Sequence, residues 1–194
     1  MIEIFKHGNS GIDIFKYKGQ TAMQVVGVED AFTKLAENLK DNPVKRIVEL
    51  GTDYGGLTNL LADNEISKDA DIHTFDINGQ RFKSHNNKIK FYNQSFESAY
   101  EQIKSLIESE GRVLLLCDGG NKEAEFAAFH RYLKDGDIIM GHDYAPNKQE
   151  FLDNFHGKIW NWHEFEDSFA NFKNLEPFMQ EVFYNYAWCI RIKN

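Results

Sequence analysis

An apolar run that contains an acid and leads into a glycine-bearing turn is the feature that most constrains this chain. The run covers residues 47–50 and includes Glu49, and the turn that follows carries Gly51, Gly55 and Gly56 ahead of a helix-like pattern. This order is typical of a strand followed by a tight turn and a helix N-terminus that accepts a nucleotide-sized ligand. The spacing differs from the Gly-x-Gly-x-x-Gly of dinucleotide sites, so it favours a single nucleoside.

Apolar runs alternate with amphipathic segments along the rest of the chain. Strands are predicted at 46–50, 71–77, 89–92, 112–117 and 137–140. Helices are predicted at 29–40, from 57 to 62, at 96–108 and at 122–133. Late runs at 181–184 and 187–192 predict an antiparallel hairpin around Asn185 and Tyr186. The pattern indicates an α/β fold, with a mostly parallel sheet, helices on both faces and a C-terminal antiparallel hairpin.

The composition is that of a globular protein and predicts a single domain over residues 1–194. A net charge of −8 disfavours a nucleic-acid partner, because phosphate binding needs a basic surface. No apolar run reaches the length of a membrane span, and the N-terminus lacks the apolar core of a secretory signal. Cys117 and Cys189 lie inside apolar runs and are expected to be buried and reduced, as in a cytoplasmic protein. The 14% of aromatic residues would favour a homo-oligomer where they lie on the surface.

Acidic residues stand at the predicted carboxyl ends of the strands, where ligands bind in sheets of this kind. Glu49 closes the first strand and Asp76 the second, 25 positions after Gly51. A carboxylate at that distance can accept hydrogen bonds from both ribose hydroxyls of a nucleoside. Each acid taken alone is better explained by the capping of a loop, and only the two together, in this order, favour a ligand.

A second group of polar residues follows the next two strands. Asp118 ends one strand, and His142 and Asp143 end its neighbour, so the three side chains are expected to converge. Two carboxylates and an imidazole can hold a divalent cation, although loop capping explains them equally well. Lys122, four positions after Asp118, would be a general base if burial lowered its pKa, and is otherwise an exposed lysine.

These motifs resemble the class I S-adenosylmethionine-dependent methyltransferases. The pattern Glu49-x-Gly51-x-x-x-Gly55 followed by Asp76 is similar to their cofactor-binding turn. Within that class, the metal-dependent small-molecule O-methyltransferases and the cephalosporin-hydroxylase-like group are the most similar. The shared segments are Ala22-Met23-Gln24-Val25, Leu115-Leu116-Cys117-Asp118-Gly119-Gly120 and the stretch 134–144, which ends in His142-Asp143-Tyr144.

The resemblance implies a Rossmann-like methyltransferase fold and the O-methylation of a small-molecule hydroxyl by S-adenosylmethionine, assisted by Mg²⁺ or Mn²⁺. It assigns Asp143 and Lys122 to catalysis and Asp118, His142 and Asp143 to the metal. Residues 1–28 would form a lid over cofactor and substrate, and the aromatic-rich insertion 145–180 would line the substrate side. The implied cofactor-binding residues are Met23, Val25, Glu49, Gly51, Thr52, Gly55, Gly56, Asp76, Ile77, Gln94, Ser95 and Asp118.

Three positions depart from the family pattern. Asp53 stands where a second glycine is usual, His142 replaces the first acid of a pair, and Asn121 occupies the place of the catalytic lysine. The first two departures leave open a non-catalytic Rossmann-like protein that only binds a nucleoside. A nicotinamide-dependent oxidoreductase is a further alternative, which the glycine spacing disfavours.

Overall fold

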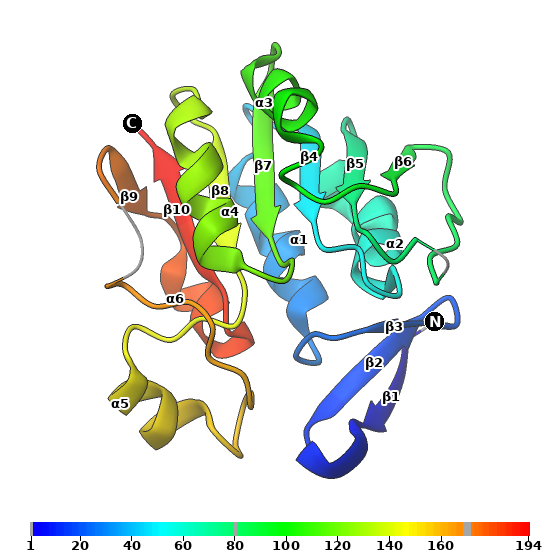
Figure 1. The fold of residues 1–194 in the computed structure, drawn as a ribbon, viewed down its shortest axis with the longest axis vertical. Coiled ribbons are helices and arrows are strands. Elements are labelled where there is room, and N and C mark those ends of the chain that lie inside the picture. The colour runs from blue at the N-terminus through cyan, green and yellow to red at the C-terminus, as the bar shows by residue number, and fades with distance from the viewer. Residues whose placement is uncertain (1, 80, 169–171) are drawn as a thin grey trace.

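A computed structural model describes residues 2–79, 81–168 and 172–194, and Figure 1 shows the fold. Its centre is a seven-stranded sheet in the order β6-β5-β4-β7-β8-β10-β9. Neighbouring strands from β6 to β8 run parallel, and β10 runs antiparallel to both β8 and β9. The strands are β4 (Val44–Leu50), β5 (Asp71–Phe75), β6 (Ile89–Tyr92), β7 (Arg112–Cys117), β8 (Ile138–Gly141), β9 (Leu175–Pro177) and β10 (Cys189–Lys193). The five strands predicted for the parallel part are therefore confirmed, with small changes at their ends.

The C-terminal antiparallel pair is confirmed, but its first strand is not the predicted one. Residues 181–184 lie in helix α6 and the turn after it, and β10 pairs instead with Leu175–Pro177. The Gln180 side chain bonds to the carbonyl of Trp188 (2.8 Å) and to the amide of Ile190 (2.9 Å), which ties the helix back onto β10. Phe183 is fully buried, so this short helix is held by tertiary packing.

Helices cover both faces of the sheet, as predicted. On β7, Leu114 and Leu116 belong to the core shared with α1, α2 and α6, whereas Val113 and Leu115 belong to the core shared with α3 and α4. Figure 1 shows α3 and α4 on the face toward the viewer. The helices are α1 (Val28–Asn38), α2 (Gly56–Asp63), α3 (Tyr100–Glu108), α4 (Lys122–Phe129), α5 (Lys148–Glu150) and α6 (Gln180–Phe183). Shorter helical turns occupy Gly8–Ser10, Glu65–Ser67, His130–Tyr132, Phe151–Phe155 and Tyr184–Tyr186.

Two peripheral segments lie beyond the carboxyl ends of the parallel strands. The N-terminal residues form a three-stranded antiparallel sheet, and the chain after β8 forms α5 and the loop that follows it; both lie below the main sheet in Figure 1. The three strands are β1 (Ile2–Lys6), β2 (Asp13–Tyr17) and β3 (Gln20–Ala22). Gly56 permits β3 to lie against α2, since a Cβ at this position would be 2.5 Å from the amide nitrogen of Ala22. The edge of the sheet that carries the acids is thus enclosed from two sides.

Both cysteines are buried with free thiols, as predicted. Across the three described ranges, no helix combines the length and the apolar character that crossing a membrane requires.

Candidate active site

A cavity of about 220 Å³ opens at the carboxyl ends of β4, β5 and β7. Leu50 and Phe75 contribute to its apolar wall, and Asp76 contributes a carboxylate. This carboxylate is held in place by the backbone amides of Asp53 (2.8 Å) and Asn78 (2.7 Å). Each of its oxygens keeps a further lone pair for a ligand. An apolar wall beside a fixed carboxylate suits a nucleoside, with the base on the wall and the ribose hydroxyls on Asp76.

Gly51 directly follows β4 and lies against the backbone of Asp118 and Gly119, which follow β7. Its φ is +98°, and a Cβ would be 2.2 Å from the carbonyl oxygen of Asp118. Glycine is therefore required here by the backbone of the neighbouring turn, whether or not a ligand is bound. A larger residue at this position would disturb the sheet edge as well as the cavity.

A second cavity of about 240 Å³ shares Gly51 with the first. Its lining comes from β3 and the segment after it, the turn after β4 and the start of α2, the ends of β7 and β8 with the start of α4, and the loop after α5. Among its polar and aromatic members are Gln24, Asp118, Lys122, His142, Asp143, Trp160, Trp162 and Glu164. The predicted convergence of Asp118, His142 and Asp143 therefore occurs, and it occurs beside the nucleoside-sized cavity.

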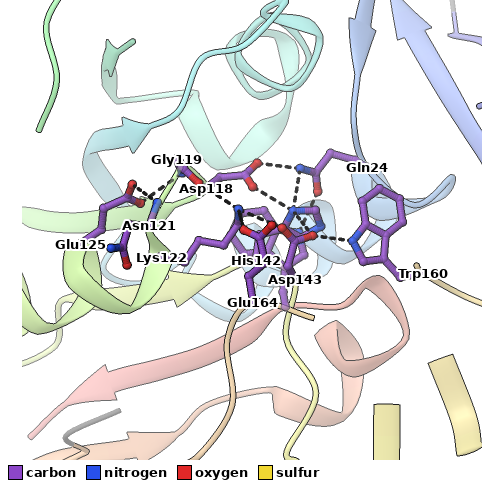
Figure 2. A network of polar contacts seen from close by, with 11 residues as sticks. Gln24, Asp118, Gly119, Asn121, Lys122, Glu125, His142, Asp143, Trp160 and Glu164 are labelled. Carbon is purple, nitrogen blue, oxygen red and sulfur yellow. Dashed lines mark hydrogen bonds and ion pairs between the residues drawn. The ribbon is translucent and has the colours of Figure 1, made fainter. Parts of the chain in front are cut away.

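His142 is buried, lines the second cavity and belongs to the network of polar contacts drawn in Figure 2. Its Nδ1 is 2.8 Å from Asp118 Oδ1, and the Gln24 amide donates to Asp118 Oδ2 at 2.7 Å. Gln24 in turn accepts a hydrogen bond from the Trp188 indole at 2.9 Å. The imidazole lies between the rings of Trp160 and Trp188, with centroids 5.2 and 4.6 Å away. Contacts from four segments of the chain thus fix the orientation of Asp118.

Lys122 joins two acids of this cavity, Asp143 and Glu164. Its Nζ is 2.8 Å from Asp143 Oδ2, 2.9 Å from Glu164 Oε2 and 2.8 Å from the carbonyl oxygen of Gly119. The second oxygen of Asp143 accepts a hydrogen bond from the Trp160 indole. Both oxygens of Asp143 are therefore engaged inside the protein.

The charges of this network keep Lys122 protonated. Burial alone would lower the pKa of Lys122, but the charges of Asp118 and Asp143 and the hydrogen bonds to Asp143 and Glu164 raise it overall. The condition for a general base, a pKa lowered by burial, is therefore not met. For Asp143 the directions are reversed. Burial alone would raise its pKa, but the charges of His142 and Lys122 lower the pKa overall.

The arrangement does not fit a divalent metal ion. The oxygens of Asp118 are taken by His142 and Gln24, and those of Asp143 by Lys122 and Trp160. A divalent ion needs several carboxylate oxygens directed at one point. In the described part of the chain, no group of three or more His, Cys, Asp and Glu side chains is arranged in that way.

The sequence-predicted cofactor residues divide between the cavities and the core. Those that line the first cavity are Gly51, Asp76, Ile77, Gln94 and Ser95. Those that line the second are Met23, Gly51, Thr52 and Asp118. Four others line neither, namely Val25, Glu49, Gly55 and Gly56.

The surroundings of these four residues explain why none of them lines either cavity. Glu49 is buried below the turn and accepts hydrogen bonds from Thr58 (2.6 Å) and Thr74 (2.5 Å). Gly55 and Gly56 lie against Phe82 and β3. Val25 lines a separate cavity beside the N-terminal sheet.

Two buried carboxyls predict an unusual dependence of stability on pH. Burial raises the pKa of Glu49 and of Glu125 from 4.5 to about 7. Between pH 4.5 and about pH 7, these carboxyls keep their protons in the folded protein and lose them in the unfolded chain. The free energy of unfolding therefore falls as pH rises through this range. We expect Glu49→Gln to reduce this fall in urea denaturation measured between about pH 5 and pH 8. A variant that follows the same pH profile as the wild type would contradict the assignment.

Three residues of the second cavity were not singled out from the sequence, namely Gln24 as a buried hydrogen-bonding residue, Trp160 and Glu164, and neither was Trp188 behind them, which contacts Gln24 and His142. Gln24 is a lone amide in an apolar stretch, and such a polar residue is a usable signal. Trp160 and Glu164 belong to the insertion 145–180, which the resemblance assigns as a whole to the substrate side, but no local signal distinguished these two residues from ordinary core packing.

The sheet, with β10 antiparallel between β8 and β9, and the cavities at its carboxyl edge define the fold of the class I S-adenosylmethionine-dependent methyltransferases. This confirms the fold expected from the sequence. The chain is similar to a solved structure described as "cmcI-D160 Mg-SAM", with a TM-score of 0.64 and 14% identity over 91% of this chain and 76% of that one. It is similar to "CmcI-N160 apo-structure" with a TM-score of 0.67 and 13% identity, over 96% and 78% of the two chains. No family model and no curated protein matches the sequence.

Proposed function

We propose that this protein is an S-adenosylmethionine-dependent methyltransferase that methylates a hydroxyl group of a small molecule. The observation that carries the proposal is the pair of cavities that meet at Gly51, one suited to a nucleoside and the other lined by acids and an imidazole. S-adenosylmethionine is the cofactor we choose because the sequence motifs resemble those of the methyltransferases and because structures of the same fold are described with SAM and with SAH. At 13–14% identity they support the fold only, so the activity rests on the two cavities.

The residues of the first cavity would bind the adenosine part of the cofactor. Asp76 would accept hydrogen bonds from the ribose hydroxyls, and Ile77, Gln94 and Ser95 would lie beside the base and sugar. Gly51 and Thr52 would face the remainder of the molecule where the cavities meet. S-adenosylmethionine, when bound, supplies a methyl group on a positively charged sulfur.

The residues of the second cavity would hold the acceptor. Asp118 and Asp143 keep unused lone pairs that can accept the proton of a hydroxyl group, and Asp143 is the residue to which we assign that role. Gln24, Trp160 and Lys122 fix these carboxylates, so that the acceptor oxygen is aligned before transfer. The metal assistance expected from the resemblance is left out of the proposal, because Lys122 Nζ already lies between Asp143 and Glu164 and the described residues hold no cluster of three or more His, Cys, Asp and Glu side chains that could bind a metal ion.

Two segments would determine which small molecule enters. Met23 and Gln24 belong to the segment 1–28, and Trp160, Trp162 and Glu164 belong to the insertion 145–180. We assign the first segment to a lid and the second to the substrate wall. A small molecule fits a cavity of about 240 Å³, and the net charge of −8 disfavours a nucleic acid. A cytoplasmic location and a homo-oligomeric state stay predictions from the sequence.

A thermal-shift titration tests the cofactor, because a ligand that binds only the folded state raises the melting temperature. We expect S-adenosylmethionine and its demethylated product to raise it, and NAD to leave it unchanged. Incubation of the cofactor with a panel of catechols, sugars and other polyols, followed by detection of the demethylated product, tests transfer. Stabilisation by NAD alone would support an oxidoreductase. Cofactor binding without turnover across the panel would support a non-catalytic nucleoside-binding protein.

A further inference from the structure

The ammonium group of Lys122 lies at the point where the acids of the second cavity converge. Lys122 begins α4, and its side chain turns back toward the carboxyl ends of β7 and β8, where it is 6% exposed. Three oxygens surround Nζ at 2.8–2.9 Å, from Asp143, Glu164 and the backbone of Gly119. An ammonium group has three hydrogens to donate, so this set satisfies all of them.

The acids need a cation at this point. Asp143 is buried and Glu164 is half-exposed, and Asp118 ends the neighbouring strand of the same cavity. Carboxylates brought together out of water repel one another unless a positive charge lies between them. Lys122 supplies that charge on a side chain that cannot diffuse away.

We propose that Lys122 takes the place of a divalent cation in this site, so that the protein needs no bound metal ion there. This proposal rests on the proposed function, because it says which positive charge balances the acids of the second cavity. Its test measures metal binding and does not depend on methyl transfer. Lys122 is a positioning residue in this account. It holds Asp143 and Glu164 in place and leaves their unused lone pairs for the ligand.

Removal of the ammonium group should create a metal site. In Lys122→Ser, two carboxylates and the carbonyl oxygen of Gly119 would face the vacated position, with Asp118 near them. Hard divalent ions favour such oxygen ligands. Lys134 offers a matched control, because its Nζ is also 2.8 Å from a carboxylate, that of Asp137, but among the described residues its one other hydrogen bond is to the carbonyl oxygen of Ile107.

The experiment is a titration of the chelator-treated full chain with Mn²⁺, followed by the electron paramagnetic resonance signal of the free ion. We expect no saturable site in the wild type or in Lys134→Ser up to about 1 mM Mn²⁺, and one site at least about tenfold tighter in Lys122→Ser. The double variant Lys122→Ser/Asp143→Asn should lose that site. Calorimetry with S-adenosylhomocysteine on the same chelator-treated wild type tests the cofactor separately.

The proposal would be overturned if the wild type bound Mn²⁺ at one saturable site and Asp143→Asn abolished that site. This comparison of the wild type with Asp143→Asn needs no substitution of Lys122. A folded Lys122→Ser protein that gains no site would also overturn the proposal. If Lys122→Ser does not fold, Lys122→Gln, which is closer in length, replaces it under the same two criteria. Absence of S-adenosylhomocysteine binding would count against the proposed function and leave the cation assignment standing.

Discussion

Replacement of Asp143 by alanine is expected to lower the free energy of unfolding by about 3–5 kcal/mol, because it removes one partner of a buried ion pair. Lys122 would lose its 2.8 Å contact with this carboxylate, and the Trp160 indole would lose its acceptor. Native domains are stable by only about 5–15 kcal/mol, so the loss would be a large share of the total. Urea denaturation at neutral pH measures it.

Two controls separate the ion pair from other effects at this position. Asp143 has a φ of +55°, a conformation that asparagine tolerates better than alanine, so Asp143→Asn removes the charge with less backbone strain. Asp69→Ala removes a carboxylate that is 3.8 Å from Lys45 on the surface, where a pair contributes about 0–1 kcal/mol. If Asp143→Ala proves no more destabilising than Asp69→Ala, the buried network does not stabilise the fold.

Asp76→Ala is expected to weaken the binding of S-adenosylhomocysteine by about 10- to 100-fold. A hydrogen bond to a charged group contributes about 1.5–3 kcal/mol, and each 1.4 kcal/mol is a factor of ten in affinity. The carboxylate is already held in place by the amides of Asp53 and Asn78, so no ordering cost reduces its contribution. Isothermal titration calorimetry provides the dissociation constants.

The same backbone contacts require a control, because Asp76→Ala also removes an acceptor from the turn after β4. Asp76→Asn keeps one oxygen for a backbone amide but removes the charge, so we expect an intermediate loss of affinity. Asp69→Ala lies outside both cavities and should bind as the wild type does. An unchanged dissociation constant in Asp76→Ala would exclude the ribose assignment.

Strands β7 and β8 were predictable because each is an almost continuous apolar run, and the second half of β4 is apolar apart from Glu49. Strands β5 and β6 are short segments rich in β-branched and aromatic residues. The last part of the sheet was not predictable. Its edge strand, Leu175–Pro177, has three residues and ends in a proline, which is no strand signal. Residues 182–184 form a short run of β-branched and aromatic residues, as a buried strand would, but Phe183 packs against Phe32 with ring centroids 5.4 Å apart. That contact, made over a long sequence separation, favours the helix.

For the site, the sequence predicted that Asp118, His142 and Asp143 converge, because adjacent parallel strands end at the same edge. It did not predict the role of Glu49, since a residue at a strand end can face a cavity or the core. Here two threonine hydroxyls from α2 and β5 satisfy the Glu49 carboxyl below the turn. The position of a residue in a strand determines which edge of the sheet its side chain lies near. Whether that side chain faces a cavity or the core depends on the residues that pack around it in the fold.

By itself the sequence determined the parallel sheet, the order of its acids and the glycines of the first turn, because local periodicity and backbone conformation depend on neighbouring residues. Only the tertiary structure decided that Lys122 lies among the acids and that Gln24 fixes Asp118. The contact between Lys122 and Glu164 joins residues 42 positions apart, and the contact between Gln24 and Asp118 joins residues 94 positions apart. Their geometry follows from how the N-terminal sheet and the loop after α5 enclose the carboxyl edge, and no local pattern of residues encodes that enclosure.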